Sequence, residues 1–397
     1  MTKRYVVYSS KISLTADSAH EIHDVMCANA VANLGESTIL VYPNQSPQIF
    51  SWLQPFKLQQ PEENFVQFYN IQASLKTSIV PLPSKLKYWD QKLKIFSRLI
   101  YQYYLPFQVF PITKIIHTRD WNCVKAAVRH QTPVIYERHY FQKQMYEPAI
   151  VNSPFLKIAI TQSEPIRQSL LQAGMPPEKV VWLHNGFSPA FLNREPEDAQ
   201  AWRKQLLNAH KRPYLAIYSG ALYRFKGVDL LIDVAKRLPD CQFAITGGTT
   251  EQVNTYRQMA LEKGVDNIQF LGWILPRSRL VSLLQAADVL LHPHRSGEAA
   301  NFTNPVKFFQ YMASGTPIVA TKIPPLMPFQ SIPLAAEWCP PDHEQDLAQC
   351  IESALTRYPK KAEGYRSNID YARQFTWEER AVKIINYAGQ DSELLEE

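Results

Sequence analysis

Short apolar runs alternate with helical stretches along most of the chain, and this alternation constrains the fold more than any other feature. A short apolar run between turn residues is typical of a buried strand, and strands that alternate with helices are typical of a doubly wound parallel sheet. The runs that we predict as strands are Tyr5–Tyr8, Thr38–Tyr42, Ile115–His117, Val134–Tyr136, Ile158–Ile160, Val180–Trp182, Tyr214–Tyr218, Gln242–Ile245, Asn267–Leu271, Asp288–His292 and Ile318–Ala320.

The length of 397 residues suits two domains of this kind. We predict a first domain over 1–188, a polar linker with one helix over 189–212, and a second domain over 213–375. Only three of the 13 glycines lie in the first half of the chain. Because close approach of backbone to a ligand favours glycine, we expect the nucleotide side in the second domain.

The composition excludes several classes of protein. Hydrophobic residues make up 46% of the chain and charged residues 20%, as in a globular protein. No apolar run is long enough to span a bilayer, and the N-terminus lacks a signal-peptide pattern. Five cysteines without a close pair favour a reducing compartment over a disulfide framework or a zinc site. The net charge of +6 suits a phosphorylated substrate or an anionic membrane, and no nucleic-acid motif accompanies it.

The stretch 288–320 predicts a strand, a polar loop, a helix and a second strand. Asn304 is a good N-cap, Pro305 fits the first helical position, and Gly315 is a natural C-terminal cap. A helix that begins at the carboxyl end of a parallel strand presents free N–H groups and the positive end of its dipole. This stretch therefore predicts a site for a phosphate or diphosphate.

The run 304–320 resembles the donor-site helix of the GT-B glycosyltransferases of family 4, also called glycosyl transferases group 1, and the resemblance extends over most of the chain. It implies an α/β fold of two facing doubly wound, Rossmann-like domains with a cleft between them. It also implies metal-independent transfer of a sugar from a nucleotide diphosphate sugar to an acceptor hydroxyl with retention of configuration, and no cofactor. The acceptor would be a glycan or glycolipid, assembled in the cytoplasm or at the inner face of a membrane. The helix in 376–397 resembles the family helix that returns to the first domain.

The loop after the strand 214–218 carries the donor-side cations. Gly220 permits close approach, and Lys226 matches the phosphate-binding lysine of the family. The arginine that the family places after this glycine is Ala221 here, and Arg224 is the remaining cation. A solvated basic loop is the alternative for both cations.

Further donor-side candidates follow later strands. Trp273 lies in the segment that resembles the base-reading backbone, and the glycine turn at Gly248 ends another strand. Of two family glutamates, the later is Gln310, which can bond a ribose hydroxyl, and the earlier is Phe302. We expect Glu298 to supply an acid from the same loop and Lys307 to reach a phosphate; a surface glutamate and a solvated lysine are the alternatives.

The first domain carries the catalytic and acceptor-side candidates. His139 resembles the family histidine that faces the donor sugar, with a packing histidine as the alternative. Ser10, Lys11, His117 and Asp120 follow strands and are candidates for acceptor contact; Asp120 is either a general base or a loop cap. His292 and His294 alternate at a strand end without a third ligand, which argues against a metal.

Residues 84–107 interleave lysines with aromatic residues. Such a helix either lies on an anionic membrane or packs with a solvated lysine face. Two other functions stay open: a nucleotide-sugar epimerase on this scaffold, and a non-catalytic binding protein derived from a transferase.

Overall fold

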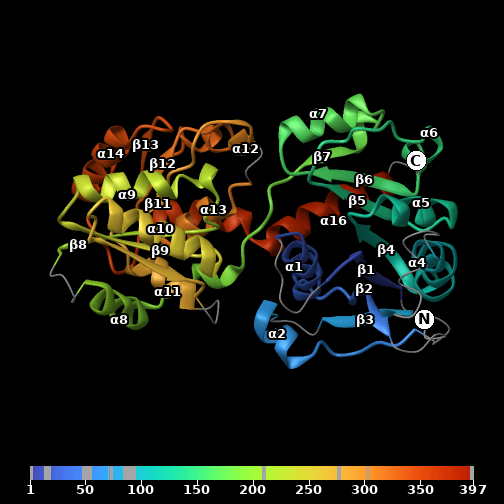
Figure 1. The fold of residues 1–397 in the computed structure, drawn as a ribbon. Coiled ribbons are helices and arrows are strands. Elements are labelled where there is room, and N and C mark those ends of the chain that lie inside the picture. Colours follow the sequence, from blue (N-terminus) through green and yellow to red (C-terminus); the bar gives the residue numbers. More distant parts are fainter. Residues whose placement is uncertain are drawn as a thin grey trace. The chain divides into compact units, whose positions relative to one another are not determined.

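The structure is a computed structural model that describes residues 3–12, 19–46, 56–69, 71, 75–83, 95–207, 212–274, 279–301 and 304–393. It divides into two compact units, each built around one parallel sheet (Figure 1). Unit 1 holds Met1–Asn185 and Trp377–Glu397, and unit 2 holds Gly186–Thr376. The predicted architecture of two doubly wound parallel sheets is confirmed.

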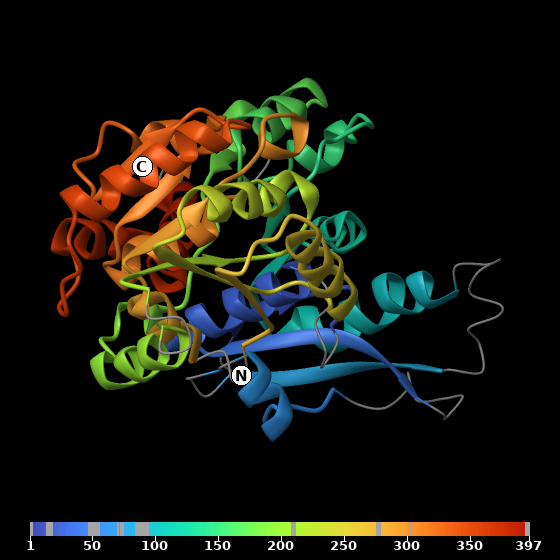
Figure 2. The same cartoon turned by 60° about the vertical axis from the view of Figure 1, so that its left-hand side comes forward.

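The sheet of unit 1 has the strand order β3-β2-β1-β4-β5-β6-β7, with every neighbouring pair parallel. Its strands are β1 (Arg4–Tyr8), β2 (Thr38–Ser46), β3 (Lys76–Pro83), β4 (Thr113–Thr118), β5 (Val134–Arg138), β6 (Leu156–Thr161) and β7 (Val180–Trp182). β2 and β3 lie side by side in blue at one edge (Figure 2). The strand order reverses between β1 and β4, which is where doubly wound sheets bind their ligands.

Helices cover both faces of this sheet, because the strands are apolar on both sides. One face packs against η3, α5 and α7, and the other against α1, α2 and α16. The helices are α1 (Ala19–Asn33), α2 (Glu63–Tyr69), α4 (Ile95–Arg98), the π-helix η3 (Leu99–Val109), η4 (Phe110–Ile112), α5 (Trp121–Arg129), α6 (Pro148–Val151), α7 (Glu164–Gln172), η5 (Pro177–Lys179) and α16 (Trp377–Glu393). Although α16 comes last in sequence, it packs against α1 because Trp377, Ala381 and Ile384 form one buried stripe (Figure 1).

The sheet of unit 2 has the strand order β10-β9-β8-β11-β12-β13, and it reverses between β8 and β11. Its strands are β8 (Tyr214–Ser219), β9 (Cys241–Thr246), β10 (Ile268–Gly272), β11 (Val289–His292), β12 (Ile318–Thr321) and β13 (Ala336–Cys339). Its helices are η6 (Pro189–Leu192), α8 (Pro196–Leu207), η7 (Arg224–Lys226), α9 (Val228–Arg237), α10 (Thr250–Glu262), α11 (Arg279–Ala286), α12 (Glu298–Asn301), α13 (Val306–Ser314), η8 (Pro324–Phe329), α14 (Glu344–Arg357), α15 (Arg366–Ala372) and η9 (Arg373–Phe375).

The structure differs from the sequence-based expectations mainly at edges and boundaries. The edge strands β3 and β13 were not predicted. Each pairs with a single strand of its sheet, and β3 also forms an isolated antiparallel bridge between Thr77 and Gln59. A strand at the edge of a sheet needs no long apolar run. Within 189–212, α8 buries Ala199, Trp202 and Leu206 in unit 2, so this helix is part of that unit's core.

Candidate functional site

The strand-end loops of unit 2 approach one another closely at the reversal between β8 and β11. A Cβ on Gly247 would lie 2.0 Å from the carbonyl oxygen of Gly220, and a Cβ on Gly248 would lie 2.5 Å from the Leu222 side chain. Gly247 and Gly248 both have positive φ angles, of 110° and 78°. Glycine is therefore required at Gly247 and Gly248, where these loops meet.

Lys226 ends the short turn η7 and points toward the end of β11. Its Nζ lies 2.7 Å from His294 Nε2. Burial and the nearby charge of Lys307 lower the pKa of Lys226 to about 8. Among the described residues, no carboxylate forms an ion pair with Lys226. A largely buried cation beside a second cation favours an anionic ligand.

Helix α13 begins beside these cations. Pro305 takes the N-cap position, one residue later than the predicted cap Asn304, and Lys307 lies in the first turn. Gln310 Oε1, further along the helix, is buried and accepts no hydrogen bond within the described residues. A buried acceptor of this kind is costly unless a ligand donor completes it. Gly315 ends the helix with φ of 71°, the left-handed cap that the sequence predicts.

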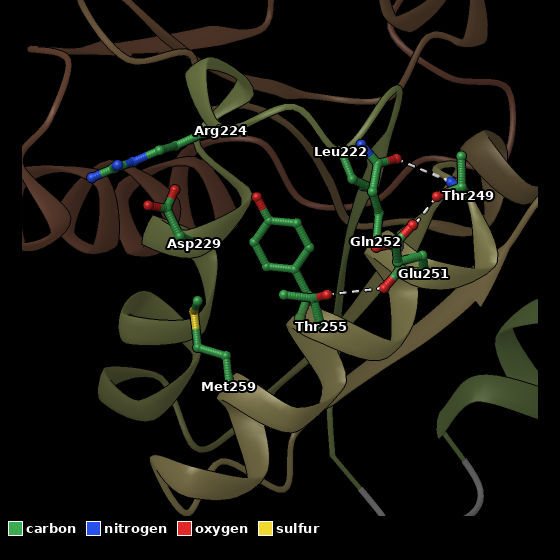
Figure 3. Close-up of a pocket in the computed structure, with 9 residues that line it drawn as sticks. Leu222, Arg224, Asp229, Thr249, Glu251, Gln252, Thr255 and Met259 are labelled. Carbon is green, nitrogen blue, oxygen red and sulfur yellow. Dashed lines mark hydrogen bonds between the residues drawn. The ribbon is translucent and has the colours of Figure 1, made fainter.

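Arg224 belongs to the same turn as Lys226 but is exposed. It lines an open hollow together with residues of α9 and α10, and its side chain extends away from Leu222 and Thr249 (Figure 3). The structure thus separates the two cations of this loop, since only Lys226 contacts the end of β11.

The other donor-side candidates are exposed. Trp273 follows β10 and is 60% exposed, so it is not a core residue of unit 2. Glu298 opens the short helix α12 on the surface of unit 2. Phe302, which stands in place of a family glutamate, lies outside the described residues.

Glu137, near the end of β5, is the centre of a buried network in unit 1. Its Oε1 accepts hydrogen bonds from His139 Nε2 at 2.6 Å and Arg380 Nη2 at 2.7 Å. His23 Nε2 lies 2.9 Å from the same oxygen, and His117 Nε2 lies 3.0 Å from Oε2. Burial alone would raise the pKa of Glu137, but Arg380, His23 and His139 hold it well below its usual range. The carboxylate is therefore ionised.

This carboxylate fixes the tautomers of the rings around it. His139 donates its Nε2–H to Glu137, and burial lowers the pKa of His139 to about 3, so the neutral ring keeps Nδ1 as an acceptor. His23 differs, because Asp24 Oδ1 lies 3.3 Å from its Nδ1. Burial opposes a charge on His23, but Cys27, Glu137 and Asp24 outweigh it and raise the pKa of this ring well above normal.

Two of the acceptor-side candidates are occupied within the protein. His117 is buried, with Nδ1 bonded to Tyr5 and Nε2 to Glu137, so neither ring nitrogen is left for an acceptor. Asp120 caps α5 by accepting from Asn122 N and Cys123 N, as its loop-cap alternative predicted, and its Oδ2 accepts from Tyr101. The partners of His117 come from the neighbouring strands β1 and β5, so the sequence of its own strand does not reveal them.

Ser10 and Lys11 are exposed directly after β1, at the reversal of the unit 1 sheet. Sequence reasoning missed His23, Asp24 and Arg380, which complete the network around Glu137. One signal was available for Arg380: it lies within the apolar stripe of α16, between Trp377 and Ile384, where a charged residue needs a buried partner.

Within the described residues, one group has the spacing of metal ligands, namely His23, Cys27 and Glu137. Arg380 Nη2 lies 2.7 Å from Glu137 and Nη1 lies 3.5 Å from Cys27 Sγ. The guanidinium therefore stands where a metal ion would have to bind, and its charge would repel one.

Of the basic aromatic stretch, residues 84–94 lie outside the described residues. In the described part, Tyr103 and Phe107 of η3 are 51% and 69% exposed. None of the described helices is long and apolar enough to cross a bilayer.

Comparison with known proteins finds glycosyltransferases among the proteins that this chain is similar to. The model of the family "Glycosyl transferases group 1" matches residues 198–374. A D-inositol 3-phosphate glycosyltransferase of Corynebacterium aurimucosum is 27% identical over 184 residues, which cover 43% of this chain and 41% of the relative. An alpha-galactosylglucosyldiacylglycerol synthase of Streptococcus pneumoniae is 26% identical over 38% of this chain and 39% of the relative. The chain thus spans about two fifths of the length of these curated relatives.

Solved structures match over nearly the whole chain. Anabaena Alr3699/HepE in complex with UDP and glucose has a TM-score of 0.67 at 15% identity, and covers 97% of this chain and 99% of its own. A glycosyltransferase from Rickettsia africae has a TM-score of 0.66 at 14% identity, and covers 98% and 99%. At these identities the likeness shows the fold, which is GT-B.

Proposed function

We propose that this chain, whose residues 198–374 match the model of the glycosyl transferases group 1, transfers a sugar from a nucleotide diphosphate sugar to an acceptor hydroxyl on a glycan or glycolipid. The observation that carries the proposal is Lys226. It is a partly buried cation without a carboxylate partner among the described residues, beside Lys307 at the start of α13. Cations and a helix N-terminus at the reversal of a parallel sheet suit a departing diphosphate.

On the donor side, Lys226 and Lys307 stabilise the negative charge that develops as the glycosidic bond to phosphate breaks. Gln310 Oε1 accepts a hydrogen bond from a ribose hydroxyl, which completes its missing partner. Trp273 and Gly248 border the nucleobase and the phosphates, and Arg224 and Glu298 act from the exposed part of the same surface.

On the unit 1 side, His139 accepts a hydrogen bond from a sugar hydroxyl through Nδ1, since its Nε2–H is held by Glu137. Ser10 and Lys11 contact the acceptor. We propose retention from the resemblance to family 4. We propose metal independence because fixed cations of the protein supply the charge that a metal supplies elsewhere.

The names of similar proteins suggest the first probes. The similar Anabaena structure holds UDP and glucose, and two relatives are named for an inositol phosphate and a glycosyldiacylglycerol. UDP-sugars are therefore the first donors to test, and phosphorylated polyols and glycolipids the first acceptors.

The decisive experiment is thermal stabilisation of the purified chain by UDP, GDP and ADP and their sugar conjugates in EDTA. A ligand at about a hundred times its Kd adds about 2.7 kcal/mol, which shifts the melting temperature clearly. A rise in melting temperature with one nucleotide only supports the donor site and identifies the nucleobase of the donor. No shift with any nucleotide would refute the proposal and favour a non-catalytic binding protein.

Turnover then separates the enzymes that share this scaffold. A transferase consumes the donor only when an acceptor is present, whereas an epimerase converts the donor alone. Proton NMR of the anomeric position in the first-formed product tests retention, and activity that needs an added divalent ion would contradict metal independence.

Contact with a membrane is a separate part of the proposal. Tyr103 and Phe107 are exposed aromatic residues that follow a lysine-rich stretch of sequence. Such residues insert at an anionic interface. Sedimentation with vesicles of anionic and of zwitterionic lipid tests this, and equal binding to both, or none, would contradict it.

A further inference from the structure

His292 and His294, at the end of β11, lie in contact beneath Lys226. His294 Nε2 is 2.7 Å from Lys226 Nζ, and His294 Nδ1 is 2.8 Å from His292 Nδ1. The two rings are stacked with centroids 3.9 Å apart, and both are buried. Three side chains thus form one hydrogen-bonded chain that begins at the ammonium group.

The turn that carries Lys226 is fixed onto this strand end by its backbone. Arg295 N donates a 2.9 Å hydrogen bond to Phe225 O. Gly227, with φ of 72°, lets the chain approach so closely that a Cβ there would lie 1.8 Å from Pro293 O. From β12, Thr321 Oγ1 donates to the carbonyl oxygens of His292 and His294. Lys226 and the two histidines are therefore held in one rigid arrangement.

Charge fixes the direction of the hydrogen bonds. Burial and the charge of Lys226 lower the pKa of His292 to about 3, and burial, His292 and Lys226 hold the pKa of His294 well below its usual range. Both rings are neutral, so the ammonium donates to His294 Nε2. His294 then carries its proton on Nδ1 and donates it to His292 Nδ1.

Arg295, the neighbouring cation, has carboxylates as its partners. Arg295 forms ion pairs with Asp229 at 2.7 Å and with Asp342 at 3.2 Å. Such carboxylates cancel a charge locally, whereas a neutral imidazole holds a cation in place and leaves its charge for a ligand. Lys226 contacts a neutral histidine in place of a carboxylate, so the charge that it carries below its pKa is left for a ligand.

We propose that His294, oriented by His292, is a positioning residue that holds the Lys226 ammonium in place without neutralising it, so that the full charge meets the diphosphate of the donor. The proposal rests on the proposed function of Lys226 as the diphosphate-binding cation. It assigns a role to a histidine pair whose spacing alone suggested a metal site lacking a third ligand.

Among the residues that the structure describes, the charged and titratable groups that face Lys226 are Lys307 from α13 and the two histidines from the end of β11. Because burial and Lys307 lower the pKa of Lys226 to about 8, affinity for a diphosphate falls as the pH rises through about 8. A carboxylate in place of His294 would raise this pKa and move the fall in affinity to higher pH.

The test compares His294→Asp, His294→Gln and His294→Leu with His343→Asp, an exposed histidine in the same unit. Titration calorimetry measures UDP and inorganic diphosphate binding between pH 7 and 9.5. We expect His294→Asp and His294→Leu to weaken UDP binding at pH 7 about tenfold, the size of one charge-assisted contact. His294→Gln, which keeps a neutral acceptor, and His343→Asp should bind as the wild type does.

A second readout needs no ligand. Lysine labelled with 13C at Cε gives the pKa of Lys226 by NMR, with assignment from Lys226→Arg. The proposal expects His294→Asp to raise this pKa and His343→Asp to leave it unchanged. An unchanged pKa in His294→Asp, or wild-type UDP binding in His294→Leu, would overturn it. If the wild type binds no nucleotide, the proposed function fails, while the NMR titration still decides whether His294 controls Lys226.

Discussion

Arg380 Nη2 donates a 2.7 Å hydrogen bond to Glu137 Oε1, although the two residues are 243 positions apart in the chain. Both side chains are buried, and Arg380 comes first among the groups that hold the pKa of Glu137 low. The C-terminal helix thus supplies the cation that balances the carboxylate at the end of β5. This pairing makes the last helix a part of the candidate site in unit 1.

Replacing Arg380 with methionine should destabilise unit 1 by about 3–5 kcal/mol, because Glu137 is left as a buried charge without its cation. Guanidinium unfolding monitored by tryptophan fluorescence measures this. Glu137→Gln in the same chain should restore part of the loss, since the remaining group is neutral. Arg373→Met is the matched control: its ion pair with Asp370 is exposed and should cost less than about 1 kcal/mol. Equal effects of the two arginine variants would contradict the prediction.

Lys226→Ala should weaken nucleotide diphosphate binding by about 1.5–3 kcal/mol, the contribution of a hydrogen bond to a charged group. Titration calorimetry with the nucleotide selected by thermal stabilisation measures the change. The exposed Lys236→Ala on α9 removes the same charge from the same unit and should leave affinity nearly unaltered. Affinity unchanged in Lys226→Ala would remove this lysine from the site.

His139→Ala should lower turnover about 100-fold, as expected for loss of one hydrogen-bonding group that acts on the reacting sugar. Nucleotide binding should be unaltered, because the proposed phosphate contacts belong to unit 2. The exposed His130→Ala in unit 1 is the control and should turn over normally. Full activity in His139→Ala would assign this histidine to packing alone.

Gly227→Ala should destabilise unit 2 by about 3 kcal/mol or more, since a Cβ there would collide with Pro293 O at 1.8 Å. Gly264→Ala provides the comparison: its φ is also positive, at 66°, but nothing lies within 4 Å of the added carbon. That variant should cost only about 1–2 kcal/mol, for the left-handed conformation itself. Denaturant unfolding measures both, and similar losses would mean that the contact with Pro293 is unimportant.

Acid should destabilise the protein well above the range in which carboxylates titrate. Burial lowers the pKa of His139 and of His292 to about 3, while an unfolded histidine titrates near 6.5. The unfolded chain therefore binds more protons as the pH falls from about 6.5 toward 3, and stability is lost in that window. Each such histidine adds about 1.4 kcal/mol per pH unit to the loss of unfolding free energy as the pH falls.

Unfolding in guanidinium at a series of pH values measures this slope. His23, whose pKa is raised, opposes the trend, because its stabilisation is present at low pH and is lost as the pH rises. His292→Phe should reduce the slope of unfolding free energy against pH by the contribution of one proton, about 1.4 kcal/mol per pH unit. A slope identical to that of the wild type would show that His292 is protonated in the folded protein.

The fold could be predicted from the sequence because its signals are local. Apolar runs such as Val134–Tyr136 have a buried strand as their natural state, and a glycine after a helical run, as at Gly315, specifies a left-handed cap. The loop that carries Lys226 could also be placed after a strand, where ligands bind in this architecture, whereas the role of Lys226 stays a prediction from the family resemblance. Edge strand β13 could not be predicted, because a strand that pairs on one side needs little apolar character and so leaves a weak signal in the sequence.

The sequence by itself thus determined the two doubly wound sheets and the positions of the loops that follow their strands. Only the tertiary structure decided which groups meet. It pairs Arg380 with Glu137 and Lys226 with His294, and it leaves Arg224 at an open hollow away from Lys226's partner. The physical reason is range. Strand and cap preferences depend on neighbours a few residues away, whereas the charge and tautomer of a buried ring depend on partners that folding brings from distant parts of the chain.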